Sequence, residues 1–105
     1  MTEGREQLKR ALSANPKAAA DLGAEALLGA GNLARQQGDY EESLKLLKES
    51  QAIYHRLADS PGESHTIYEL GWTYYRMAQF KEARSHFSAA LKKADELKNK
   101  EIRVV

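Results

Sequence analysis

At 105 residues the chain has room for one domain, and its 42% hydrophobic and 30% charged residues are typical of a folded protein. A formal net charge of +1 argues against a nucleic-acid partner, and the absence of cysteine excludes disulfides and thiolate metal sites. No apolar run is long enough to span a membrane and the polar N-terminus lacks the core of a secretory signal, so we expect a cytoplasmic protein without a membrane partner.

Apolar residues recur at intervals of three and four along most of the chain, which predicts amphipathic helices. The predicted helices span residues 3–13, 17–37, 40–58, 61–77 and 80–98, and residues 99–105 form a tail or the start of a truncated helix. The turns between them are short, so neighbouring helices must pack antiparallel. The predicted fold class is therefore all-α, an antiparallel helix-hairpin solenoid of five helices.

Two helix starts carry a capping signal. Asp39 stands three residues before Glu42, and Ser60 stands three residues before Glu63. In this pattern the first side chain accepts a hydrogen bond from a backbone N–H that has no partner inside the helix. We therefore expect the third and fourth helices to begin at these positions.

The sequence repeats itself after 40 residues. The matched pairs are Leu27 with Ile67, Gly31 with Gly71, Tyr40 with Phe80, and Leu47 with Phe87. Repeat one would cover residues 17–58 and repeat two residues 61–98, while residues 3–13 would be the second helix of a preceding unit. The chain then contains about two and a half helical hairpins in one domain.

Gly31 and Gly71 lie in the middle of predicted helices, where a glycine costs about 1 kcal/mol relative to alanine. That cost is understandable if a large side chain of the partner helix occupies the space. The predicted contacts are Tyr40 and Leu47 on Gly31, and Phe80 and Phe87 on Gly71.

These residues resemble the tetratricopeptide repeat family. The second unit carries the resemblance best, through Ile67–Tyr74 followed by Phe80, Ala83, Phe87, Ala90 and Leu91. The longer period and Gly38-Asp39-Tyr40 are similar to the solenoids of large bacterial signalling ATPases and transcription regulators. This resemblance implies a scaffold that binds a protein or peptide, and a chain that is part of a larger regulatory protein.

In solenoids of this family the first helix of each pair lines a concave groove. The resemblance, together with helical spacing, gives ten candidate binding residues: Glu25, Leu28, Asn32, Arg35 and Gln36 from the first unit, and His65, Tyr68, Trp72, Tyr75 and Arg76 from the second. Asn32 is the polar group most like the groove asparagines of the family, which hold a peptide backbone.

Tyr68, Trp72 and Tyr75 form an aromatic stripe with Arg76 beside it. Aromatic residues and arginine dominate the energetics of binding interfaces. The same rings could instead pack against a neighbouring repeat or subunit, in which case the chain would be a structural spacer or a self-association module. Because solenoid units bury their apolar faces only against neighbours, we also expect the exposed ends to favour a homo-oligomer.

No constellation for chemistry is visible. His55, His65 and His86 fall on three different predicted helices, without the spacing of a zinc-binding helix. No nucleophile stands beside a base in an apolar setting. We therefore expect no catalytic residues, no metal and no cofactor, and a protein that is not an enzyme.

Overall fold

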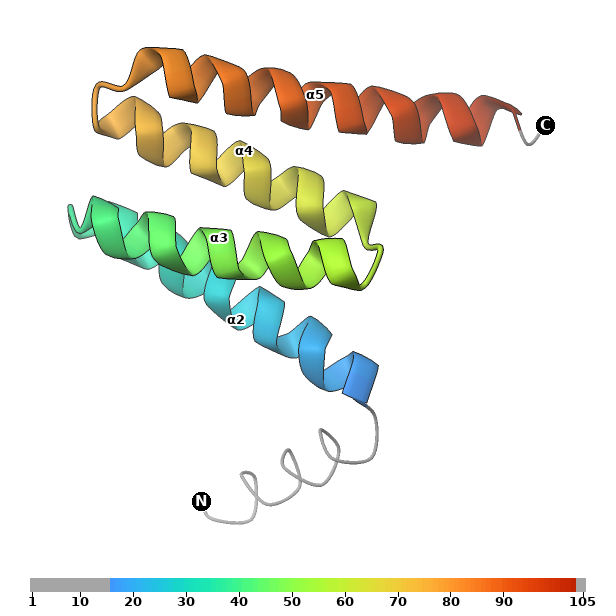
Figure 1. The fold of residues 1–105 in the computed structure, drawn as a ribbon, viewed down its shortest axis with the longest axis horizontal. Helices are drawn as coiled ribbons and strands as arrows, with labels where there is room; N and C mark the ends of the chain where they lie inside the picture. The colour runs from blue at the N-terminus through green and yellow to red at the C-terminus, as the bar shows by residue number, and fades with distance from the viewer. Residues whose placement is uncertain (1–15, 104–105) are drawn as a thin grey trace.

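The computed structural model describes residues 16–103, and the side chains of residues 16–98. Four helices follow one another along the chain: α2 (Pro16–Gln36), α3 (Tyr40–Arg56), α4 (Ser60–Arg76) and α5 (Phe80–Arg103). They lie side by side in chain order, and the C-terminal part of α5 runs past the first residues of α4 (Figure 1). The predicted all-α stack of antiparallel hairpins is confirmed. The count of five helices is not, because the described residues hold four and the predicted helix 3–13 lies outside them.

The three turns between the helices have one shape. Each has three residues, and the middle one, Gly38, Ala58 or Ala78, adopts a left-handed conformation with φ of 81°, 55° or 61°. The backbone N–H of the following residue returns to a carbonyl of the last helical turn, as Asp39 does to Ala34 at 2.8 Å. This closure satisfies carbonyls at the helix end and reverses the chain. Turns spaced by 20 residues therefore generate the 40-residue repeat.

Side-chain caps fix where α3 and α4 begin. Oδ1 of Asp39 accepts from the backbone N of Glu42 at 3.3 Å, as the sequence pattern predicts. At α4 the prediction was wrong, because the cap is Asp59 and Ser60 is already helical. Oδ1 of Asp59 accepts from Gly62 N at 3.0 Å. A Ser60 cap would need the Glu63 N–H, which already donates to the Asp59 carbonyl at 2.9 Å.

Each hairpin closes where a large side chain lies on a glycine. A Cβ placed on Gly31 would stand 2.7 Å from Leu47, and a Cβ placed on Gly71 would stand 2.7 Å from Phe87. The predicted contact of Phe80 with Gly71 is wrong, since every atom closest to Gly71 belongs to Phe87 and Phe80 is 60% exposed. Phe80 is the first residue of α5 and therefore lies level with the end of α4, about one and a half turns from Gly71.

The predicted contact of Tyr40 with Gly31 is wrong for the same reason. Tyr40 is the first residue of α3, and the atoms nearest to Gly31 all belong to Leu47. In both hairpins the residue seven positions into the second helix, rather than the first, meets the glycine.

One hydrogen bond between the two helices occurs at the same place in both hairpins. Its donor is on the second helix of the first hairpin and on the first helix of the second hairpin. Ser50 Oγ of α3 donates to the Ala24 carbonyl of α2 at 2.8 Å. Ser64 Oγ of α4 donates to the Ala90 carbonyl of α5 at 3.0 Å. Ala24 and Ser64 are 40 positions apart, as are Ser50 and Ala90, so the 40-residue alignment places structurally equivalent residues together.

Candidate binding groove

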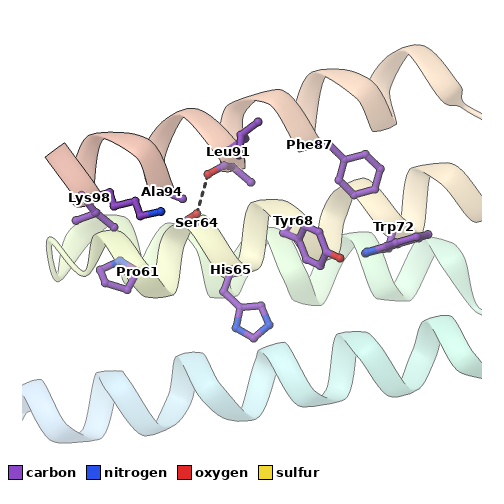
Figure 2. A pocket seen from close by; sticks show the side chains of 11 residues that line it. Pro61, Ser64, His65, Tyr68, Trp72, Phe87, Leu91, Ala94 and Lys98 are labelled. Atoms are coloured by element: carbon purple, nitrogen blue, oxygen red, sulfur yellow. Dashed lines mark hydrogen bonds between the residues drawn. The ribbon is translucent and has the colours of Figure 1, made fainter.

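An open groove of about 820 Å³ runs along α4 and α5. Figure 2 shows its side chains projecting from both helices into the space beside them. The lining is apolar apart from Ser64, His65 and Lys98. It consists of Pro61, Ser64, His65, Tyr68 and Trp72 from α4, and Phe87, Ala90, Leu91, Ala94, Leu97 and Lys98 from α5.

Gly71 determines the floor of this groove. Its missing side chain admits the Phe87 ring, whose carbon atoms would otherwise be 2.7 Å from a Cβ. In that position the centroid of the Phe87 ring lies 5.6 Å from that of Tyr68 and 5.4 Å from that of Trp72. These separations are favourable for aromatic pairs. One glycine therefore organises three rings from two helices.

The rings continue toward the turn between α4 and α5. The Trp72 centroid lies 6.1 Å from that of Tyr68 and 5.6 Å from that of Tyr75, which in turn is 5.4 Å from Phe80. We call these five rings (Tyr68, Trp72, Tyr75, Phe80 and Phe87) the aromatic row. All except Phe87 are exposed, and Trp72 is 38% exposed. A contiguous apolar surface of this kind is typical of an interaction site.

Three of the ten candidate residues line the groove, namely His65, Tyr68 and Trp72. Tyr75 extends the aromatic row, and Arg76 is exposed at the end of α4. The five first-unit candidates lie on α2 and do not line this groove. Glu25 and Gln36 are exposed, while Leu28 and Asn32 are half-buried.

Arg35 is engaged inside the protein. Its Nη2 lies 2.7 Å from Glu69 Oε2 and its Nη1 donates to the Glu69 carbonyl at 2.9 Å, with both side chains at most 15% exposed. The pair joins α2 to α4, so Arg35 acts as a link between the two repeats. Asn32 differs, because among the described residues its buried Oδ1 has no hydrogen-bond partner.

Sequence reasoning missed the α5 half of the groove. Phe87, Leu91, Ala94 and Leu97 all follow the helical spacing of α5, whereas the candidate binding residues were sought only on the first helix of each pair. Leu91 is nevertheless 65% exposed. The available signal was the width of the apolar stripe, which is greater than one neighbouring helix covers.

Glu63 supplies the clearest electrostatic feature, away from the groove. Its buried carboxylate pairs with His55 Nδ1 at 3.1 Å and with Lys93 Nζ at 3.2 Å. Burial alone raises the pKa of the Glu63 carboxyl, but the hydrogen bonds and charges of His55 and Lys93 outweigh it and lower the pKa overall. The charged Glu63 therefore ties α3, α4 and α5 together.

A family model described as tetratricopeptide repeat matches residues 22–96, which include all of α3 and α4. The chain belongs to the tetratricopeptide repeat family. Members of this family are non-catalytic repeat scaffolds that mediate protein–protein interaction. Comparisons with curated proteins and with solved structures gave no match. The resemblance to bacterial signalling ATPases and transcription regulators therefore stays a prediction.

The two tetratricopeptide repeats have equivalent grooves, of which one is filled and the other is open. The 40-residue offset relates the α4–α5 groove to one between α2 and α3, where Trp72 corresponds to Asn32, Phe87 to Leu47 and Ala94 to Tyr54. There α4 occupies the space, with Gly62 directly against the Tyr54 ring, and Leu47 and Tyr54 are buried. The inner groove is thus filled by a helix, and the outer one is open.

Two further observations on the tetratricopeptide repeat array concern membrane spans and metal sites. Among residues 16–103, no helix is both long enough and apolar enough to cross a membrane. Within the same range, no group of three or more histidine, aspartate or glutamate side chains is arranged to hold a metal ion.

Proposed function

We propose that this tetratricopeptide repeat protein is a non-catalytic binding module whose α4–α5 groove receives an α-helix of a partner protein. One observation carries the proposal. The equivalent groove between α2 and α3 is already filled by a helix, α4, so the shape that recurs on α4 and α5 is one that accepts a helix. A helix in a groove is also a recurrent mode of peptide recognition.

The composition of the groove supports the same proposal. Trp72 and Tyr68 are residue types that contribute most to binding energy, and Leu91 and Leu97 offer apolar surface on the opposite wall. His65 and Lys98 supply polar groups at the rim. An amphipathic helix with an apolar face and an acidic margin would match this distribution.

We place the main binding contacts on the second unit. The proposed residues are His65, Tyr68 and Trp72, with Tyr75 and Arg76 continuing along α4. In the first unit Arg35 is occupied by Glu69, so it is not free to hold a ligand. Asn32, with its unpartnered Oδ1, is the first-unit residue we propose as a secondary contact.

A second candidate is a self-association module, in which the aromatic row packs between subunits. It is favoured by a specific observation on α2, where Leu22 and Leu33 are 44% and 53% exposed. A place within a larger cytoplasmic signalling protein also remains a prediction from the sequence.

The proposal can be tested by affinity capture with quantitative mass spectrometry. Wild-type protein would be compared with Leu91→Glu, which puts a charge on the groove wall, and with Lys48→Glu, a charge change on an exposed position of α3. We expect a set of captured proteins that Leu91→Glu loses and Lys48→Glu keeps. Equal capture by all three would contradict the proposal.

A further inference from the structure

We propose that the helix received by the α4–α5 groove is α2 of a second copy of this chain, docked as α4 docks on α2 and α3. The inference rests on the proposed function, because it names the occupant of the same groove. Several residues of the inner interface and their outer counterparts differ in a coordinated way, which supports this docking.

The face of α2 that would dock is apolar and open. It consists of Leu22, Ala26, Gly29, Ala30 and Leu33, all of them exposed. Their counterparts 40 positions later are Gly62, Thr66, Glu69, Leu70 and Thr73, which form the face of α4 turned toward α2 and α3, with Thr66, Leu70 and Thr73 fully buried. The helix that fills the inner groove therefore has an unfilled equivalent in α2.

The first coordinated change concerns size. In the inner interface Gly62 of α4 lies against the large ring of Tyr54. In the proposed interface the counterpart of Gly62 is Leu22, and the counterpart of Tyr54 is Ala94. A small residue facing a large one is thus replaced by a large residue facing a small one, which keeps the filled volume similar.

The second change concerns polarity. In the inner interface Ser43 Oγ and Thr73 Oγ1 share a buried hydrogen bond of 3.0 Å. Their counterparts are Ala83 and Leu33, both apolar. Replacing both partners of a buried hydrogen bond by apolar groups is close to neutral, whereas replacing one leaves an unsatisfied group.

The third change concerns charge. The inner interface is held by Arg35 with Glu69, whose counterparts are Tyr75 and Gly29. Gly29 has open space around its Cβ position, so the exposed Tyr75 ring can lie over it. At this pair of positions, docking α2 would therefore bury no unpaired carboxylate.

The His55–Glu63 pair of the inner interface changes in the same way. Its counterparts are Asp95, which is exposed, and Gly23, which is half-buried. A carboxylate at position 23 would face Asp95, and the glycine there removes that repulsion. Each copy carries one docking face and one groove, so the contact is head-to-tail.

The test uses two exposed positions in the full chain. Leu22→Glu spoils the α2 face and keeps the groove, whereas Ala94→Glu spoils the groove and keeps the α2 face. Sedimentation equilibrium would be run from about 1 μM to about 1 mM, a range that covers moderate and weak affinities. We expect wild-type protein to self-associate, and each variant alone to have a dissociation constant raised at least about tenfold by the unpaired charge.

Mixing the two variants distinguishes a head-to-tail contact from any other. The groove of Leu22→Glu can take α2 of Ala94→Glu, so the mixture should form a 1:1 dimer with the wild-type affinity and should not grow further. Association of wild-type protein without recovery in the mixture would overturn the inference. Should circular dichroism show that a variant has lost helix, Leu33→Glu and Leu91→Glu form an equivalent pair.

A wild-type chain that is monomeric throughout would also overturn the inference. That result leaves the proposed function intact if Leu91→Glu still loses captured proteins. If wild-type protein is monomeric and Leu91→Glu captures the same proteins as wild type, the α4–α5 groove is not a binding site.

Discussion

The α2–α3 groove and the α4–α5 groove are built from corresponding helices and turns, but only the first is covered by another helix of the described chain. In the first, Leu47 and Tyr54 are buried under α4. In the second, Leu91 and every ring of the aromatic row except Phe87 are exposed. The difference shows that a repeat does not hide its apolar surface by itself, but depends on the helix that follows it.

The two grooves also differ in how their occupants are selected. The inner one is joined to α4 by polar groups, including the Arg35–Glu69 pair and the Ser43–Thr73 hydrogen bond. The outer one has the exposed Tyr75 ring at the position of Arg35 and the buried Ala83 at the position of Ser43. Polar pairs fix one register, whereas an apolar groove with a polar rim can admit a separate molecule.

Truncating one leucine in each groove tests this contrast most strongly. Leu47→Ala should destabilise the protein by about 2–5 kcal/mol, because Leu47 is fully buried and the cavity cannot close completely. Leu91→Ala should change stability by less than about 0.5 kcal/mol, because Leu91 is exposed. Urea denaturation of dilute samples measures both, and equal losses would show that the outer groove is covered.

Gly71→Ala tests whether the floor of the outer groove is set by a glycine. The new Cβ would overlap Phe87, so we expect a loss of about 1–3 kcal/mol offset in part by better helix propensity. Gly23→Ala is the matched control, since nothing lies within 4 Å of its Cβ position and it should gain about 0.5–1 kcal/mol. A gain at both positions would mean that Phe87 is not held by Gly71.

Glu63→Gln weakens the link among α3, α4 and α5, with a cost near neutral pH of about 1 kcal/mol. The pKa of Glu63 is lower in the folded protein than its ordinary value of 4.5. Its contribution is therefore complete above that value and is lost as the pH falls through the lowered pKa. Denaturation from pH 3 to pH 6 should show the wild-type advantage shrinking below about pH 4.5, and an advantage independent of pH would contradict this role.

Ala78→Gly tests the turn of the outer hairpin against that of the inner one. Gly38 suits the left-handed conformation of the inner turn, whereas Ala78 adopts it with a side chain at φ of 61°. Glycine at position 78 should therefore raise stability by up to about 1 kcal/mol. A loss on thermal denaturation would show that the alanine methyl makes a compensating contact.

The helices and the repeat were predictable because local signals determine them. Apolar spacing placed the four described helices, and the glycines at 31 and 71 predicted a close approach within each hairpin. The choice of Leu47 and Phe87 over Tyr40 and Phe80 was harder. It depends on antiparallel register, which spacing within a single helix does not specify.

The α4 half of the candidate site could be predicted from the sequence, and the α5 half could not. Tyr68 and Trp72 were found from their position on one helix, whereas Leu91 and Leu97 were not, because an apolar residue in α5 looks the same whether or not a neighbour covers it. Arg35 shows the opposite case. Its partner Glu69 lies 34 residues away, so its burial in an ion pair depends on tertiary packing.

Trp72 provides the most direct test of the account, since it is the single tryptophan of the chain and lies in the groove. Its emission would be followed as protein concentration rises, and separately as a captured partner is added, with Leu91→Glu as the control. We expect a shift to shorter wavelength and protection from acrylamide quenching in wild-type protein, and neither in the control. Emission that stays constant while a complex forms would contradict a helix docked in the α4–α5 groove.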